Sequence, residues 1–280
     1  QRQMCIRDSA GLGAAGREYY ALDITDADQP KLLWRINADT EPQLGYAVGR
    51  PIVTKRRDGT WVVLIAAGYN NVTPGNGRGV LFVLNAANGA VLQRIDTGVG
   101  TTNQPAGLAQ LNSWVDNLLG RYLGSSDISD KSVQTIYTFR DHLSANGLGD
   151  LRQQPTMVRK RLLTTNAQTE RSVSDEPVDW LLHDGWYLDL DAQTDSGERV
   201  VLDLEQQLGV LSVVSNVPDS NACRPRAESW SYAFNYLDGG YLPIPGRSWV
   251  GRRVSSASMV VGARLVRIGN QLVSVLTDDS

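Results

Sequence analysis

Cysteine, histidine and long apolar runs are scarce in this chain of 280 residues, which has 2 cysteines and 2 histidines. The histidines, His142 and His183, are not spaced like zinc ligands, and neither accompanies a G-x-S-x-G motif, so no zinc site and no serine-hydrolase triad is indicated. The longest apolar stretch, Trp61–Tyr69, has about half of the roughly 18 residues that a membrane-spanning helix needs. We therefore expect no transmembrane segment.

Basic charge is not in excess either. Lysine and arginine number 27 against 30 aspartate and glutamate residues, which gives a net charge of -3 and an isoelectric point near 5.5. Proteins that bind a phosphate backbone carry an excess of lysine and arginine. We therefore expect no nucleic-acid partner.

The first residues, Gln1–Ser9, read QRQMCIRDS and share no pattern with the sequence that follows. We interpret them as a translated sequencing adapter, and residues 10–280 as a fragment of a longer protein. Without Cys5, the remaining cysteine is Cys223, so the cysteine count gives no support for an internal disulfide. A partner for Cys223 outside the fragment and an unpaired thiol are both open at this point.

Glycine is abundant, with 27 residues, and it separates short runs of valine, threonine and tyrosine. This composition favours strands joined by tight turns. Asp-Gly, Asn-Gly and Gly-Asn pairs adopt the positive-φ turns of β-hairpins. Such pairs predict three hairpins, formed by Ile52–Thr54 with Trp61–Ala67, by Val80–Leu84 with Val91–Ile95, and by Leu265–Ile268 with Gln271–Leu276.

One strand–turn–strand unit recurs along the chain. Its copies read YYALDITDADQPKLLW from Tyr19, LFVLNAANGAVLQ from Leu81 and SYAFNYLDGGYLP from Ser231, each with Asp or Asn closing the first strand. Repeated units with aromatic anchors are typical of β-propeller blades, and a β-sandwich with long loops is the alternative. The predicted fold is all-β, an incomplete β-propeller of antiparallel blades with irregular loop insertions.

Three segments depart from this strand pattern. Ser113–Leu123 has apolar residues at helical spacing, and Glu176–Leu182 is also predicted as a short helix. Gln153–Ser174 is rich in threonine, arginine and glutamine, which predicts an excursion over the surface.

Two motifs suggest a ligand, and neither is complete. Gly11–Gly16 matches G-x-G-x-x-G, but a strand follows it where a dinucleotide site needs a helix. The acidic run DLDAQTDSGE lacks the glycine and the glutamate that a calcium loop has at its sixth and twelfth positions, so a solvated turn is favoured over a metal site. The carboxylates of this metal candidate are Asp189, Asp191, Asp195 and Glu198. No nucleophile, base and orienting residue can be assembled, so the sequence does not indicate an enzyme.

Collinear stretches from Gly16 to Gly240 resemble the C-terminal β-propeller of the PilC/PilY family, which is associated with the tip of type IV pili. They include GREYYALDITDADQPKLLWRI, LGYAVGRPIV, DGTWVVLIAAGYNN, GVLFVLNAANGAVLQRIDTGVGT, GRYLGSSDISDKSVQTIYTFRD, GWYLDL, SNVPDSNAC and SWSYAFNYLDGG. The resemblance implies a non-enzymatic module, exported to the outer membrane and pilus, that helps pilus assembly, opposes retraction and attaches to surfaces. Its implied partners are minor pilins of the pilus tip and host or abiotic surfaces.

Some members of this family hold calcium in an acidic loop, which the resemblance would place just after Gly107–Asn117. Here Asn117 runs directly into LLGRYLG, which resembles the start of a later blade. We therefore expect a deletion near residues 117–118, with Asp116 and Asn117 as the stub of the lost loop. Two ligands cannot supply the roughly six to eight oxygens that calcium takes, so no bound cofactor is expected.

Two alternative functions share the strand pattern. A dehydrogenase propeller that uses pyrroloquinoline quinone has similar strand units, but the adjacent cysteine pair of many such enzymes is absent from this sequence. A glycan-binding propeller is the other alternative.

Overall fold

The computed structural model describes residues 7–56, 58–108, 110–113, 116–120, 131–140, 156–166, 169–190, 196–218, 227–255, 258–269 and 271–278. The regular secondary structure of these residues is β-strand, and none of them forms a helix that could cross a membrane. The chain divides into two compact units. The first consists of Gln1–Val115 and Arg140–Pro155, and the second of Asp116–Phe139 and Thr156–Ser280.

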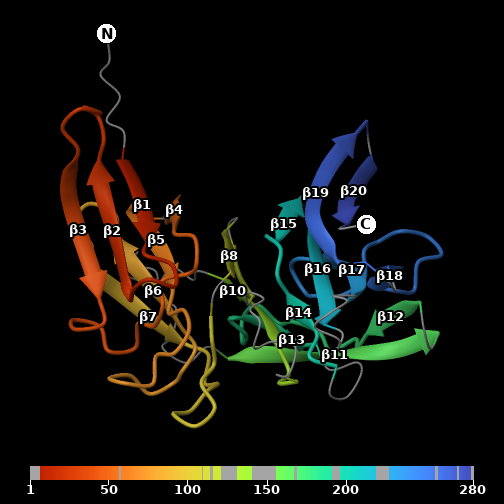
Figure 1. The fold of residues 1–280 in the computed structure, drawn as a ribbon. Coiled ribbons are helices and arrows are strands. Elements are labelled where there is room, and N and C mark those ends of the chain that lie inside the picture. Colours follow the sequence, from red (N-terminus) through yellow and green to blue (C-terminus); the bar gives the residue numbers. More distant parts are fainter. Residues whose placement is uncertain are drawn as a thin grey trace. The chain divides into compact units, whose positions relative to one another are not determined.

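The first unit contains two antiparallel sheets, of three and four strands (Figure 1). Their strand orders are β1-β2-β3 and β4-β5-β6-β7. The strands are β1 (Arg7–Gly11), β2 (Glu18–Asp23), β3 (Lys31–Asn37), β4 (Ile52–Lys55), β5 (Trp61–Ala66), β6 (Val80–Asn85), β7 (Val91–Asp96) and β8 (Gln110–Ser113). Four antiparallel strands in sequence order are the arrangement of one propeller blade.

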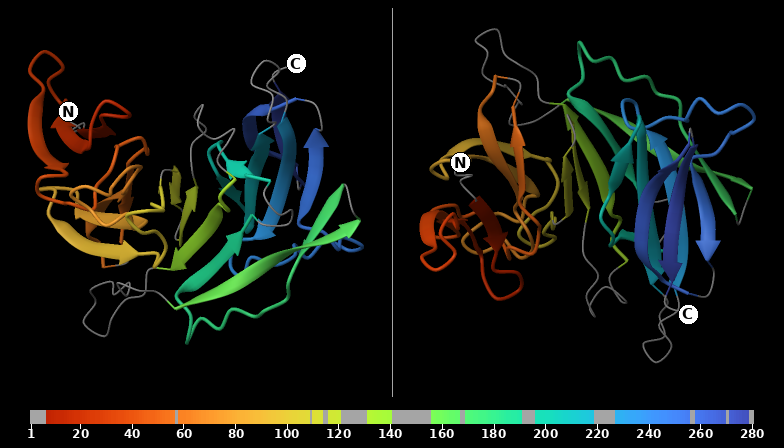
Figure 2. Two further views of the ribbon diagram at one scale, coloured as in Figure 1. Left: turned by 60° about the horizontal axis from the view of Figure 1, so that its bottom comes forward. Right: turned by 90° about the horizontal axis from the view of Figure 1, so that it is seen from above.

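The second unit contains a larger sheet that curls around its own core (Figure 2). Its order is β14-β16-β17-β18-β12-β11-β13-β10-β9, with β15 paired on β16, and β19 and β20 form a separate sheet. The strands are β9 (Asp116–Gly120), β10 (Thr135–Arg140), β11 (Met157–Asn166), β12 (Glu170–Val173), β13 (Gly185–Asp189), β14 (Arg199–Val200), β15 (Glu205–Gln207), β16 (Val210–Pro218), β17 (Ala227–Asn235), β18 (Gly251–Ser255), β19 (Val260–Ile268) and β20 (Gln271–Asp278). β11 and β13 run parallel, whereas β16, β17 and β18 are antiparallel neighbours.

The first core forms on β5 and β6 because both strands are apolar on both faces. Val62–Ala66 and Val80–Leu84 are buried without interruption, as expected for the central strands of a sheet. The core consists of Tyr19, Ala21, Trp34, Ile36, Leu44, Ala47, Val63, Ile65, Ala67, Val80, Phe82 and Leu84.

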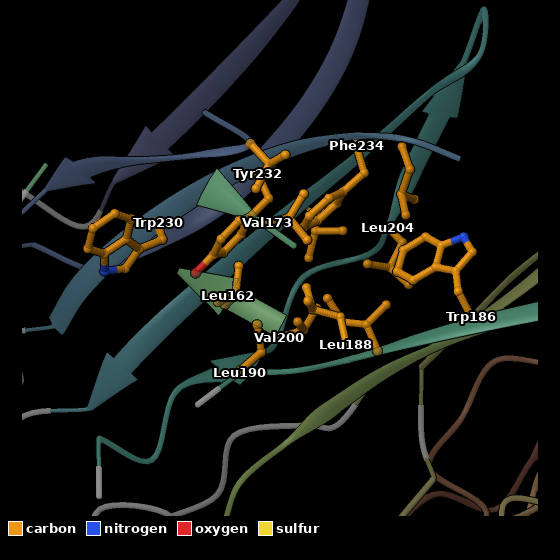
Figure 3. Packing of buried hydrophobic residues seen from close by; sticks show 14 of the residues in the cluster. Leu162, Val173, Trp186, Leu188, Leu190, Val200, Leu204, Trp230, Tyr232 and Phe234 are labelled. Carbon is orange, nitrogen blue, oxygen red and sulfur yellow. The ribbon is translucent and has the colours of Figure 1, made fainter. Parts of the chain in front are cut away.

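Alternate residues of β17 fill the second core with aromatic rings. Trp230, Tyr232 and Phe234 share one face of the strand, and the ring centroids of Tyr232 and Phe234 are 5.6 Å apart. Trp186 of β13 extends the row, with 5.9 Å between its ring centroid and that of Phe234 (Figure 3). Aromatic pairs at such separations contribute about 0.5–1.5 kcal/mol each beyond their area burial. The row therefore connects β17 and β13 across the core.

A tryptophan packs against the turn of one predicted repeat unit. In the β6–β7 turn, Gly89 donates its N–H to the Asn85 carbonyl oxygen at 2.8 Å. The Trp34 indole N–H donates to the Ala86 carbonyl oxygen at 3.0 Å, and a Cβ on Gly89 would lie 2.7 Å from the Trp34 ring. With its φ of 71°, Gly89 has a left-handed conformation that suits glycine. We call this contact the first tryptophan–turn clasp.

A second clasp repeats this arrangement in the other unit. Gly239 has a φ of 68° and donates its N–H to the Asn235 carbonyl oxygen at 2.8 Å. The Trp186 indole N–H donates to the Tyr236 carbonyl oxygen at 3.1 Å, and a Cβ on Gly239 would lie 2.8 Å from the Trp186 ring. Two of the three predicted repeat units therefore share a physical basis, an Asn-x-x-x-Gly turn covered by an indole.

The predicted all-β fold and its three hairpins are confirmed by β4–β5, β6–β7 and β19–β20. The helix over Ser113–Leu123 is wrong in its described part, because residues 116–120 form β9 beside β10 in the curled sheet. The helix over Glu176–Leu182 is also wrong. There the Asp179 side chain accepts the Leu181 N–H at 2.9 Å, which closes a tight turn in place of a helix.

Gln153–Ser174 is not the predicted surface excursion. Its described part forms β11 and β12, and Val158, Leu162 and Val173 are buried in the second core. Along β11, the exposed Arg159, Arg161 and Leu163 alternate with the buried Val158, Lys160 and Leu162, so one face of the strand points to the core. At the other end of the chain, Arg7–Ser9 pair with β2 as part of β1, and the adapter interpretation of Gln1–Ser9 stays a prediction.

Candidate functional site

A buried ion pair lies in the second core. Arg171 on β12 and Glu198 just before β14 have side chains that are 1% and 0% exposed, and the Arg171 Nη1 is 2.6 Å from the Glu198 Oε2. Removing two charges from water costs several kcal/mol per ion, and good geometry with further hydrogen bonds is needed to offset that cost. The surroundings of the pair provide these hydrogen bonds.

Two hydroxyl groups complete the hydrogen bonding of Glu198. Its Oε1 accepts from the Ser215 hydroxyl at 2.5 Å and from the Tyr232 hydroxyl at 2.6 Å. The Arg171 Nη1 donates to the Tyr232 hydroxyl oxygen, and the Arg171 guanidinium carbon lies 3.6 Å from the Trp230 ring centroid. One carboxylate therefore links β12, β16 and β17 to the segment before β14. We call Arg171, Glu198, Ser215 and Tyr232 the buried ion-pair network.

The electrostatics of the network favour a structural role. Burial and the adjacent Glu198 carboxylate raise the pKa of Tyr232 well above its usual value, so its hydroxyl stays protonated and donates to Glu198. The Nε and Nη2 atoms of Arg171 are buried without a hydrogen-bond partner, and stacking on Trp230 stabilises the guanidinium there. All four members are buried, so the network presents no solvent-accessible acid, base or nucleophile.

The predicted acidic run is not brought together as one set. Asp189 lies at the end of β13, where its Oδ1 accepts from the Thr135 hydroxyl at 2.7 Å and its Oδ2 lies 2.8 Å from the Arg159 Nη2. Glu198 belongs to the buried ion-pair network. Asp191 and Asp195 lie outside the described residues. The two described carboxylates each contact a guanidinium cation, and this donor set does not fit a calcium ion.

The other predicted residues are also placed in part. Asp116 and Asn117 lie in the backbone of β9, and His142 and Cys223 fall outside the described residues. His183 is structural, because its Nδ1 accepts the Asp179 N–H at 3.1 Å in the turn described above.

Exposed apolar side chains were missed by the sequence reasoning. The Asp179–His183 turn carries Leu181 and Leu182, which are 92% and 64% exposed. Trp61 on β5 is 56% exposed, and the Lys55 ammonium lies 5.9 Å from its ring centroid. The β19–β20 hairpin also has an exposed apolar face. The adjacent pair Leu181-Leu182 in an acidic segment could have indicated this exposure. The predicted helix hid it, because a helix there would have buried its apolar side.

Comparison with known proteins shows which family of β-propeller domains the chain resembles. The PilY1 beta-propeller domain family matches residues 4–138. The predicted resemblance of the chain to the C-terminal β-propeller of PilC/PilY proteins is thereby confirmed.

Similarity to PilY1 proteins extends beyond the matched residues. The PilY1 homolog of Xylella fastidiosa, a type IV pilus biogenesis factor, is 24% identical over 346 residues, which cover 90% of this chain and 23% of that protein. The type IV pilus biogenesis factor PilY1 of Pseudomonas aeruginosa (strain PAO1) is 23% identical over 335 residues, which cover 82% of this chain and 28% of that protein. The chain therefore spans about a quarter of the length of these relatives.

A solved structure shows the same fold. The crystal structure of the Pseudomonas aeruginosa PilY1 C-terminal domain matches with a TM-score of 0.56 at 19% identity, and the match covers 98% of this chain and 80% of that one. The Xylella fastidiosa alignment, at 346 residues, is longer than the 280 residues of this chain. That relative therefore has residues without a counterpart here, and the position of the expected deletion near 117–118 stays a prediction.

Proposed function

We propose that this chain is a non-enzymatic structural module of a type IV pilus biogenesis factor, which supports pilus assembly, opposes retraction and attaches to surfaces. The observation that carries the proposal is its alignment, over 82% to 90% of its length, with proteins named type IV pilus biogenesis factor PilY1 or its homolog. The same similarity supports an exported chain located at the bacterial cell surface, on the outer membrane and pilus. Minor pilins of the pilus tip and host or abiotic surfaces are the proposed partners.

The use of charged and apolar residues agrees with a role in contacts. The buried ion-pair network uses its ionisable groups to hold strands together. Large apolar side chains such as Leu181 and Trp61 are instead on the surface, where a partner protein can cover them. A module that works by binding needs this distribution, because its contact energy comes from surface that is exposed before the partner arrives.

A chimera in Pseudomonas aeruginosa tests the proposal. Residues 10–280 would replace the aligned segment of PilY1, and the comparison strain would carry PilY1 without that segment. We expect the chimera to restore more surface pili and a wider twitching zone than the truncated protein. Equal pilus numbers in both strains, at equal protein levels, would contradict the proposal. So would dye reduction by the purified chain after addition of pyrroloquinoline quinone.

A glycan-binding function is the second candidate, because one observation favours it. Trp61 is 56% exposed on β5, opposite Lys55 of β4, and the apolar face of an exposed indole offers a stacking surface for a sugar ring. Binding of the chain to a glycan array, lost in Trp61→Ala, would support this candidate. Leu92→Ala is the matched control, because Leu92 is an exposed apolar residue of β7 in the same sheet.

We further propose that the chain works without calcium at the predicted acidic residues. The Asp189 carboxylate contacts Arg159, and the Glu198 carboxylate contacts Arg171. Among the described acidic residues of this run, both carboxylates are therefore engaged by a guanidinium group. Added calcium should leave the melting temperature unchanged. A rise of several degrees at micromolar calcium would contradict this expectation.

A further inference from the structure

The β19–β20 hairpin is fixed at its base. Val260, at the start of β19, is buried, its carbonyl oxygen accepts from the Asn216 Nδ2 at 3.1 Å, and its N–H donates to the Ser229 Oγ at 3.1 Å. Further along β19, the Arg264 Nη1 lies 2.6 Å from the Glu205 Oε1. These contacts attach the hairpin to β15, β16 and β17, so the hairpin is held as part of the second unit.

The far part of the hairpin has an exposed apolar face. Its register places Val266 opposite Val273 and Arg264 opposite Val275, so alternate residues from both strands share one face. The apolar members of that face are Val266, Ile268, Val273 and Val275, which are 41%, 62%, 37% and 50% exposed. Two strands alone are marginally stable in water, and a further strand or packing against the apolar face normally stabilises them. It is therefore unusual that the apolar face of this two-stranded sheet is exposed.

The outer edge of β20 is unpaired in the part of the chain that the structure describes. β20 has β19 on one side, and the sheet contains no third strand. Native proteins protect such edges with charged residues, prolines, bulges or very short strands. From Gln271 to Thr277, β20 has none of these, and its sequence QLVSVLT carries no charge.

Three other sheet edges of the described residues are protected. β3 and β7, at the edges of the two sheets of the first unit, carry charged residues, and so does the free edge of β19, which also has a register shift between Val260 and Gly262. The charges are Lys31 and Arg35 on β3, Arg94 and Asp96 on β7, and Arg264 and Arg267 on β19. The contrast distinguishes β20 as an edge suited to pairing with another strand.

We propose that β20 pairs antiparallel with β20 of a second copy of this chain, so that the two hairpins form one sheet of order β19-β20-β20-β19. The hairpin supplies two strands, and the complete sheet β4-β5-β6-β7 of the same chain has four. A two-fold symmetric contact brings identical residues together, and this edge suits it because residues 271–277 carry no charges that would repel each other. The apolar faces of the two hairpins then become continuous. This dimer goes beyond the proposed pilus role and does not depend on it.

Sedimentation velocity of the purified chain, from low micromolar to several hundred micromolar protein, tests the proposal. We expect a concentration-dependent dimer, together with slower amide hydrogen exchange over residues 271–277 at the higher concentrations. Val273→Lys places like charges close together at the new strand pair and should leave the chain monomeric at every concentration. Hydrogen exchange of β19 in that variant verifies that the hairpin is still folded.

Ile268→Lys is the matched control, because it adds the same charge to the same face but on β19, one strand away from the new pair. This variant should still dimerise. A monomeric wild-type chain at all concentrations would overturn the proposal, and so would aggregates without a dimer. Loss of the dimer in both variants would also overturn it, since that result indicates packing through the apolar face instead of pairing along the edge.

Discussion

The two units place a tryptophan against a glycine turn in the same way, yet their cores differ in charge. The hydrophobic cluster of the first core contains no charged residue, and its Tyr19 hydroxyl donates to the Ala66 carbonyl oxygen at 3.3 Å. The second core contains the ion pair of Arg171 and Glu198. β14, which directly follows Glu198, has two residues and forms few ladder hydrogen bonds. The Glu198 carboxylate supplies the attachment that this short strand lacks.

Breaking the ion pair should have the largest effect. Glu198→Ala leaves the Arg171 charge buried without its partner, which is expected to lower the free energy of unfolding of the second unit by about 3–5 kcal/mol. Urea denaturation gives the total loss, and hydrogen exchange shows which unit loses it. Ser215→Ala removes one hydroxyl and should cost about 1 kcal/mol. A loss below that of Ser215→Ala would show that the pair is not stabilising.

Alkaline pH should have the second-largest effect, and it should lower the free energy of unfolding of both units. Burial raises the pKa of Tyr137 from 10.0 to about 12, and burial also raises the pKa of Tyr19 and of Tyr232. A raised tyrosine pKa means that the folded state favours the neutral hydroxyl. The resulting stability is fully present below pH 10 and is lost as the pH rises towards 12, by about 2–3 kcal/mol for Tyr137.

Denaturation at a series of pH values, with the absorbance of tyrosinate as a second readout, measures this effect. In Tyr19→Phe the pH dependence of the first unit should decrease while that of the second unit stays. Tyrosines that all ionise near pH 10 without unfolding would contradict the prediction.

The two clasps should respond equally to loss of their glycine. Gly89→Ala and Gly239→Ala each force a Cβ into an indole ring and strain a left-handed residue, at an expected cost of about 1–3 kcal/mol in the respective unit. Gly13→Ala is the control, because Gly13 has a φ of 64° but nothing lies within 4 Å of its Cβ position. Thermal denaturation followed by tryptophan fluorescence should show a larger loss for the clasp variants than for the control.

The smallest effect should come from an ion pair near the surface of the first unit. The Arg94 Nε donates to the Glu41 Oε2 at 2.9 Å, and the Arg94 side chain is 42% exposed. Glu41→Ala should cost less than about 1 kcal/mol, because solvent screens the pair. A loss as large as that of Glu198→Ala would remove the contrast between the exposed and the buried pair.

The sequence predicted features that depend on neighbouring residues. Turn pairs such as Asn88-Gly89 adopt their conformation for local reasons, so the hairpin of β6 and β7 could be predicted with its residues. The strand–turn–strand unit is also determined by neighbouring residues, so its recurrence along the sequence could predict the propeller. The shared role of Trp34 and Trp186 was not predicted, because each indole covers a turn that is distant in sequence. The separations are 52 residues for Trp34 and Ala86 and 50 residues for Trp186 and Tyr236.

Features that depend on distant residues were missed or misinterpreted. Glu198 was grouped with the acidic residues beside it, whereas its partner Arg171 comes from a strand that looked like polar surface. The polar residues of β11 and β12 concealed a buried face, because burial there depends on strands of later sequence. Sequence spacing alone could not place these groups around one carboxylate.

The sheet order of the second unit has a consequence for synthesis. β12 lies beside β18, with Glu170 opposite Arg252. The ribosome therefore synthesises β12 long before the strand that pairs with it. In the first unit, β4, β5, β6 and β7 each pair with the strand made just before or after. A growing chain can therefore complete the β4–β7 sheet early, while the second unit has to keep its half-built sheet from aggregating until β18 has emerged.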